Sequence, residues 1–206
     1  QQALYGLLPE SEREIIHWKI GQRMLKGISL HEREAKCFDL LNQLNPGLSQ
    51  VRTNEQRLEL ADLNLLAGRK AFFSAAHDAS YKYTQTGLLL LRELEAQGIN
   101  IWQDHYQLAL NLHIQGTTAS YLTNHFDEMN RLGEVITQNA RSLYDQALVY
   151  EVKLNAYLSK DDRVESLKMG LKALSLLGLK YPAKPGIPHV LAAVIKTRLK
   201  LIGKSD

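Results

Sequence analysis

Histidine and cysteine side chains bind metals and act as bases or nucleophiles, so they are the first candidates for chemistry in this sequence. The 206 residues include seven histidines and one cysteine, Cys37. His105 and His113 are close enough in sequence to share one face of a continuous helix, but they would stand about 12 Å apart along its axis. Zinc ligands lie about 2.0–2.2 Å from the metal, so these two cannot share an ion. No HxxxH or HExxH spacing occurs, and we expect neither a metal site nor a bound cofactor.

Cys37 would act as a nucleophile only with a histidine base beside it. It lies in an apolar stretch from Ala35 to Phe38, which predicts an inert, buried thiol. A single cysteine also excludes an internal disulfide and is typical of a reducing, cytoplasmic setting.

Paired carboxylates could serve as general acid and base if they converged in a cleft. Asp161-Asp162 falls in a predicted turn, and Glu10 and Glu12 fall in a predicted first helical turn. Acidic residues at such places cap helices or favour the helix dipole. We therefore expect no catalytic residues and no enzymatic activity in this chain.

A phosphoacceptor histidine would need a long dimerisation helix and an acidic residue directly after the histidine. His31-Glu32 has that order, but it opens a predicted helix and does not lie on a coiled-coil seam. We interpret it as a charge pair at a helix N-terminus.

The elements that must position all of these side chains are predicted to be helices. Prolines occur at 9, 46, 182, 185 and 188, so residues 47–181 contain none. Since proline costs about 3 kcal/mol inside a helix, this interval permits uninterrupted helices. The 37 leucines against 18 valines and isoleucines are typical of helices rather than sheets. The predicted fold class is all-α.

Start and stop signals give approximate helix boundaries. Thr53 and Gln56 form a predicted capping box, and Asn45-Pro46-Gly47 is a predicted terminator. The first full helix has an apolar face formed by Ile15, Ile16, Ile20 and Met24. The predicted helices span approximately 10–26, 31–44, 53–75, 76–97, 102–123, 126–140, 143–158, 163–177 and 189–202, with an extended linker over 181–188.

Three segments carry traces of the tetratricopeptide pattern, around 63–83, 113–136 and 151–179. Phe126 and Val164 take equivalent positions 38 residues apart, against about 34 in the standard repeat. We predict a tetratricopeptide-like solenoid of antiparallel helical pairs with degenerate repeats; a closed four-helix bundle is the alternative.

In this register, small and mostly neutral residues line a shallow concave face, which would suit a neighbouring helix or an apolar peptide. These candidate contact residues are Asn64, Gly68, Ala71, Ile114, Thr118, Tyr121, Val152, Ala156 and Ser159. Aromatic side chains could also line a pocket, although helical spacing favours packing between helices. They are Tyr81, Tyr83, Trp102, Tyr106 and Tyr121.

The last predicted helix is basic and amphipathic, a pattern that can lie on a membrane or enter a partner groove. Its cations are Lys196, Arg198, Lys200 and Lys204, beside Val190, Val194, Ile195, Leu199 and Leu201. We favour a simpler interpretation, the first helix of a further repeat whose neighbour is missing. No apolar run approaches the roughly 20 residues that a bilayer span needs, and no export leader opens the chain.

Four segments in order carry a family likeness: LNQLNPG (41–47), RLELADLNLLAGRKA (57–71), the WxxxYxLxLxLH run over 102–113, and ALSLLGLKYP (173–182). The chain resembles the helical region that follows the ATPase module in large bacterial signalling proteins. These proteins join a STAND-type ATPase (signal transduction ATPases with numerous domains) to a histidine or serine/threonine kinase. The likeness covers essentially the whole chain and rests on packing motifs.

The resemblance implies a domain organisation. Residues 1–27 would be the tail of an upstream winged-helix-like module, 28–181 the tetratricopeptide-like repeats, and 182–206 a linker with the first helix of a truncated further repeat. The phosphate loop GxxxxGK[ST] is absent from this sequence, so the ATPase and kinase would lie outside it.

We therefore expect a non-catalytic, cytoplasmic sensor or coupling segment whose partners are the ATPase and kinase domains of the same polypeptide and a protein or peptide ligand. A structural spacer or self-association module, including a homo-oligomer, is the alternative. Nucleic-acid binding through the winged-helix remnant is a second alternative. It is weakly supported by a net charge of +3 and a pI near 8.9.

Overall fold

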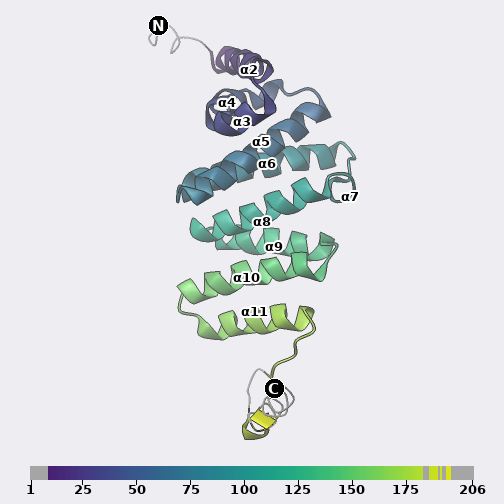
Figure 1. The fold of residues 1–206 in the computed structure, drawn as a ribbon. Coiled ribbons are helices and arrows are strands. Elements are labelled where there is room, and N and C mark those ends of the chain that lie inside the picture. Colours follow the sequence, from purple (N-terminus) through teal and green to yellow (C-terminus); the bar gives the residue numbers. More distant parts are fainter. Residues whose placement is uncertain (1–8, 183–185, 190, 192–193, 196–206) are drawn as a thin grey trace, which may run out of the picture. The chain divides into compact units, whose positions relative to one another are not determined.

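The computed structural model describes residues 9–182, 186–189, 191 and 194–195. Every regular element in these residues is a helix, so the all-α prediction is confirmed (Figure 1). The chain divides into two compact units, Gln1–Asn139 and Ala140–Asp206. This division differs from the predicted boundaries after residues 27 and 181.

The elements of each unit follow one another with short connections. The first unit contains α2 (Glu10–Lys26), α3 (Leu30–Ala35), α4 (Cys37–Leu44), the 3₁₀ helix η1 (Asn45–Gln50), α5 (Asn54–Phe73), α6 (His77–Ala96), α7 (Ile101–Asp104), α8 (Tyr106–Leu122) and α9 (Phe126–Asn139). The second unit contains α10 (Leu143–Ser159) and α11 (Arg163–Leu176).

Three antiparallel hairpins turn in the same way: α5–α6 and α8–α9 in the first unit and α10–α11 in the second (Figure 1). Each turn contains one residue with positive φ that is not glycine: Ala75 at +57°, Asn124 at +63° and Asp161 at +56°. The amide of the next residue donates to the carbonyl five residues earlier, as Ala76 does to Ala71 at 2.9 Å. This Schellman geometry closes one helix and starts the next within three residues.

Side-chain caps hold the helix N-termini where the sequence predicted them. Thr53 Oγ1 accepts from the Gln56 amide at 3.3 Å, while Gln56 Oε1 accepts from the Thr53 amide at 3.2 Å. Asp162 caps α11 by accepting from the Glu165 amide at 3.1 Å. Both predictions are confirmed, because these oxygens satisfy amides that the first turn leaves unpaired.

The N-terminal helix α2 belongs to the first unit because it packs closely on η1 and α4. A Cβ placed on Gly47 would lie 2.8 Å from Trp18 Cβ and 3.0 Å from the Glu14 carbonyl oxygen. The buried face of α2 therefore runs through Trp18, Gly21 and Leu25.

The predicted apolar face of α2 is only partly buried. Ile15, Ile16 and Ile20 are 37%, 37% and 44% exposed. Met24, the fourth residue of that face, is partly buried against the hydrophobic core.

Two predicted helices are broken. The helix expected over 31–44 divides at Lys36, where φ is −101° and ψ is 13°. The break lets α4 direct Cys37, Leu40 and Leu44 into the core. The helix expected over 102–123 divides at His105, with φ −131° and ψ 41°.

The C-terminal predictions are only partly covered by the described residues. Residues 187–189 are helical, so a helix begins inside the linker predicted over 181–188. Val194 and Ile195 are helical and exposed. The other residues named for the predicted basic helix, Val190, Lys196, Arg198, Leu199, Lys200, Leu201 and Lys204, lie outside the described residues.

Candidate functional site

The structure separates the side chains that could have shared catalytic or metal chemistry. Within the described ranges, no three His, Cys, Asp or Glu side chains are placed to hold a metal ion. His105 and His113 do not share a helix, because His105 is the break between α7 and α8. Cys37 is fully buried, and burial raises the pKa of its thiol. The prediction of a buried thiol is confirmed, and its inertness stays a prediction.

The expected charge pair at His31-Glu32 is replaced by a capping box. The Glu32 carboxylate accepts from the Ser29 amide and hydroxyl at 2.9 Å each, which holds the pKa of Glu32 below its usual range. His77-Asp78 has the same residue order and opens α6, a pair that sequence reasoning overlooked.

The predicted concave-face residues on α5 are buried within the helix packing. Asn64 is fully buried and exchanges amide hydrogen bonds with Asn45 at 2.9 and 3.1 Å. A Cβ on Gly68 would lie 2.8 Å from Thr84 Cγ2 of α6, and Ala71 is 2% exposed. These three residues therefore serve packing, because α5 has α4, α6 and α8 as neighbours.

The remaining predicted contacts lie on α8 and α10, in different units. Ile114, Thr118 and Tyr121 of α8 are half-buried. The α10 residues range from buried Ala156 through half-buried Val152 to exposed Ser159.

Most of the aromatic residues pack between helices as the spacing predicted. Tyr83 meets Phe38 with ring centroids 5.7 Å apart. Tyr81 stacks on His125 at 4.3 Å and 6°. Trp102 is different, because it also lines a pocket.

The pocket that contains Trp102 lies in the first unit and has a volume of about 280 Å³. Leu88 and Leu91 of α6 form one side and Leu132 and Val135 of α9 form the other. Both helices pack on α8. A Cβ on Gly116 of α8 would lie 2.9 Å from Leu88 Cδ1 and 3.1 Å from Leu132 Cδ1. Gly116 thus lets the two walls converge beneath the pocket.

His113 of α8 is the buried polar group of this pocket. It is 8% exposed, and its ring centroid lies 4.9 Å from that of Trp102. Burial, with the nearby cations Arg131 and Arg92, lowers the pKa of His113 to about 4, against the hydrogen bond to Ala109 and the charge of Glu128. The imidazole is therefore neutral at pH 7.

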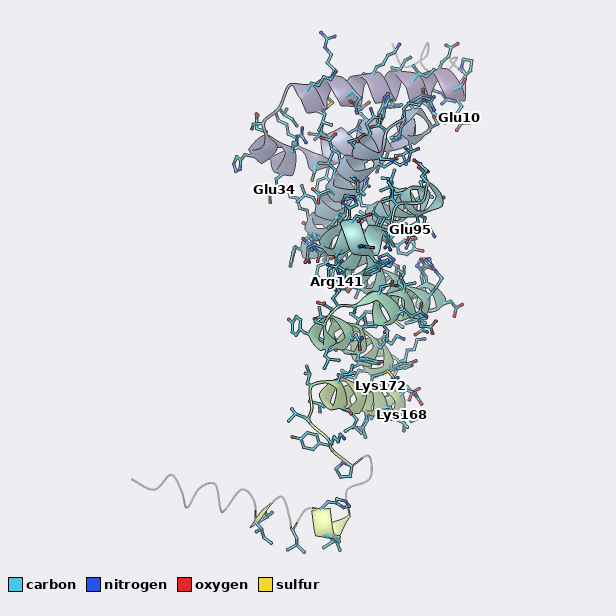
Figure 2. All side chains as sticks on the ribbon, turned by 90° about the vertical axis from the view of Figure 1, so that its right-hand side faces the viewer. Glu10, Glu34, Glu95, Arg141, Lys168 and Lys172 are labelled. Atoms are coloured by element: carbon cyan, nitrogen blue, oxygen red, sulfur yellow. The ribbon has the colours of Figure 1, made fainter. Side chains whose placement is uncertain are left out.

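Charged side chains surround the mouth of the pocket. Glu128 fixes Arg131 through two hydrogen bonds of 2.7 Å, and this contact holds the pKa of Glu128 below its usual range. Arg92 forms no ion pair with any described residue. Glu95, labelled near the end of α6 in Figure 2, lines the same mouth, and partial burial raises the pKa of its carboxyl.

Sequence reasoning missed this pocket. Residues 88, 91, 92 and 95 share one face of α6, and 131, 132, 135 and 138 share one face of α9. That spacing was available from the sequence. Nothing in one sequence, however, indicated that both faces flank the same stretch of α8.

The second unit has an apolar groove between α10 and α11, with a volume of about 410 Å³. Its leucines are Leu154, Leu158, Leu167, Leu171 and Leu174. Leu158 and Leu167 are 52% and 55% exposed. Lys168 and Lys172, labelled on α11 in Figure 2, are not among the groove residues.

Comparison with known proteins gives one curated relative. Over 159 residues the chain is 29% identical to hybrid signal transduction histidine kinase G of Dictyostelium discoideum. The match covers 68% of this chain and 5% of that protein, so the chain corresponds to a small part of the relative's length. No known family matches the chain, and no solved structure matches it. In the described residues, no helix is both long and apolar enough to cross a membrane.

Proposed function

We propose that this chain is a non-catalytic, tetratricopeptide-like segment of a multidomain signal-transduction protein, and that it couples partner binding to neighbouring ATPase and kinase domains. The similarity to a short stretch of a hybrid histidine kinase supports the signalling context. The three identically built hairpin turns support a repeating architecture. The ATPase context rests on the sequence resemblance, and the relative's organism gives no reason to restrict the proposal to bacteria.

The observation that carries the proposal is the apolar groove of the α10–α11 hairpin. Leucines on both helices face a common groove, and Leu158 and Leu167 are more than half exposed. Covering apolar surface is favourable by about 25 cal/mol per Å². An amphipathic helix from a neighbouring part of the same polypeptide would cover these side chains as a repeat covers the next repeat.

The coupling mechanism follows from differential binding. If the helix binds the groove in only one conformational state of the neighbouring domains, its binding stabilises that state. That state, in turn, strengthens the binding of the helix. A coupling free energy of about 1–3 kcal/mol between the two is typical.

The test measures binding of the chain to the remaining domains of its parent polypeptide, by calorimetry. Leu167→Asp places a charge in the groove and should weaken binding at least tenfold. Ser175→Asp puts the same charge on an exposed position of α11 outside the groove and should leave binding unchanged. Equal binding of both variants, or no binding by the unmodified chain, would contradict the proposal.

Self-association is the second candidate, because the same exposed leucines could pair with a second copy. Light scattering across a concentration series separates the two. A molar mass that rises to twice the monomer value as the protein concentration increases would favour the dimer, provided that Leu167→Asp returns it to the monomer value. The spacer role and nucleic-acid binding stay predictions.

A further inference from the structure

The pocket between α6, α8 and α9 is lined by apolar side chains and by Arg92 and Arg131, and none of these residues takes part in the partner docking proposed above. We propose that it binds a small organic monocarboxylate, with the carboxylate at Arg92 and the apolar part against the leucine walls. The proposal adds a ligand to the sensing role proposed above. It lies in the first unit, whereas the docking groove lies in the second, so the two can fail independently.

The walls of the pocket select an apolar body. Leu88 and Leu91 face Leu132 and Val135 across the cavity, and the Trp102 ring adds further apolar surface. Binding pockets for drug-sized molecules run from about 300 Å³ upward. The volume of about 280 Å³ lies just below that range and suits a molecule the size of one substituted ring.

The charges at the mouth select one negative charge. Arg131 is held by the bidentate contact with Glu128, whereas Arg92 feels the charges of Glu95 and Glu128 but forms no ion pair with a described residue. Glu95 lies at the same mouth and would repel a second negative charge. A carboxylate therefore matches the available guanidinium better than a dianionic phosphate does.

His113 supplies a fixed polar group at the floor of the pocket. Its Nδ1 lies 2.7 Å from the Ala109 carbonyl oxygen, which can only accept, so Nδ1 carries the proton. The other ring nitrogen, Nε2, is then a hydrogen-bond acceptor. The neutral His113 at the floor and the Arg92 guanidinium at the mouth orient a ligand with its carboxylate outward.

Three probes separate charge from shape in a titration of the 206-residue chain followed by amide NMR. Benzoate carries both features, benzamide keeps the ring without the charge, and inorganic phosphate keeps the charge without the ring. We expect benzoate to shift the amides of Trp102, His113 and Val135, and to bind at least fivefold more tightly than either comparison compound. Equal binding of benzamide or phosphate, or no shift at these amides with millimolar benzoate, overturns the proposal.

Variants at exposed positions keep the test independent of folding. Arg92→Gln should weaken benzoate binding about tenfold, since it removes the charge-assisted contact. Gln138→Glu, at the same mouth, should also weaken binding, and Gln138→Lys should strengthen it. Lys82→Gln removes an exposed charge from α6 outside the pocket and should leave the affinity unchanged. A loss with Lys82→Gln equal to that with Arg92→Gln would mean nonspecific attraction and would overturn the assignment.

Discussion

The Nδ1 atom of His113 lies 2.7 Å from the main-chain carbonyl oxygen of Ala109, one turn earlier in α8. The carbonyl oxygen accepts a hydrogen bond from the imidazole N–H, so this contact fixes the tautomer of a buried and neutral histidine. Burial, and after it the charges of Arg131 and Arg92, disfavour a positive charge on the ring, while the Ala109 hydrogen bond and Glu128 favour one. The balance makes His113 a pH-sensitive part of the first unit.

The first prediction concerns acid stability. The pKa of His113 falls from 6.5 to about 4 on folding. The unfolded chain therefore binds more protons than the folded chain between these two pH values. The contribution of neutral His113 to the free energy of unfolding is fully present above pH 6.5 and is lost as the pH falls toward 4. The full loss is about 3 kcal/mol.

Urea unfolding across this pH range measures the effect. His113→Phe should flatten the pH dependence, and His31→Gln, an exposed histidine, should retain it. If His113→Phe is too unstable to compare, the NMR titration of His113 in the unmodified chain decides. A measured pKa near 6.5 would contradict the prediction.

The second prediction concerns the contact between α2 and η1. Gly47→Ala would place a methyl group 2.8 Å from Trp18 Cβ and 3.0 Å from the Glu14 carbonyl oxygen. Because a backbone atom is among these neighbours, α2 must shift, and we expect a loss of about 1–3 kcal/mol. Gly27→Ala meets nothing closer than 3.5 Å and should change the free energy of unfolding by less than about 0.5 kcal/mol. Thermal unfolding of both variants checks the difference.

The third prediction concerns the hairpin turns. Ala75 adopts a left-handed conformation that costs an ordinary residue about 1–2 kcal/mol. Ala75→Gly should therefore stabilise the chain by about 1 kcal/mol. Asn124→Gly and Asp161→Gly should gain less, since asparagine and aspartate tolerate this conformation. Ala96→Gly, at the exposed last residue of α6, serves as the control and should not stabilise. Denaturant midpoints that fall for all four variants would refute the strain argument.

The fourth prediction tests the structural role of Asn64. Its side chain donates to the Leu60 carbonyl at 2.9 Å and exchanges two hydrogen bonds with Asn45. Asn64→Ala should cost about 1–3 kcal/mol because it leaves buried groups unpaired. In a double-mutant cycle with Asn45→Ala, we expect a coupling energy of at least 0.5 kcal/mol. Additive effects of the two substitutions would mean that the pair contributes nothing beyond its separate parts.

Local signals explain which parts of the fold were predictable. Thr53 with Gln56 and the proline-free interval predicted helices that the structure contains. A capping box or a proline affects only the helical turn around it, so its effect can be read from neighbouring residues. The break at His105 has no such local signal in the sequence, and Trp102 on one side of it packs against His113 on the other.

The predicted concave face shows the limit of repeat register. Asn64, Gly68 and Ala71 have the right spacing to share a helix face, but that face is covered by α6 and by Asn45. Spacing within one helix tells which residues share a face. It does not tell which neighbour covers that face, and for the same reason the pocket lined by Arg92 and Arg131 was missed.

The repeated hairpin turn has a consequence for how the chain folds. Each turn joins helices that are adjacent in the sequence, so much of the packing in each hairpin is between residues close together along the chain. Packing between helices that are neighbours in the sequence favours fast folding, because little loop entropy is lost before the first contacts form. During synthesis, the whole α5–α6 hairpin leaves the ribosome before α10 does. The α5–α6 hairpin can therefore form before the residues of the α10–α11 hairpin are available.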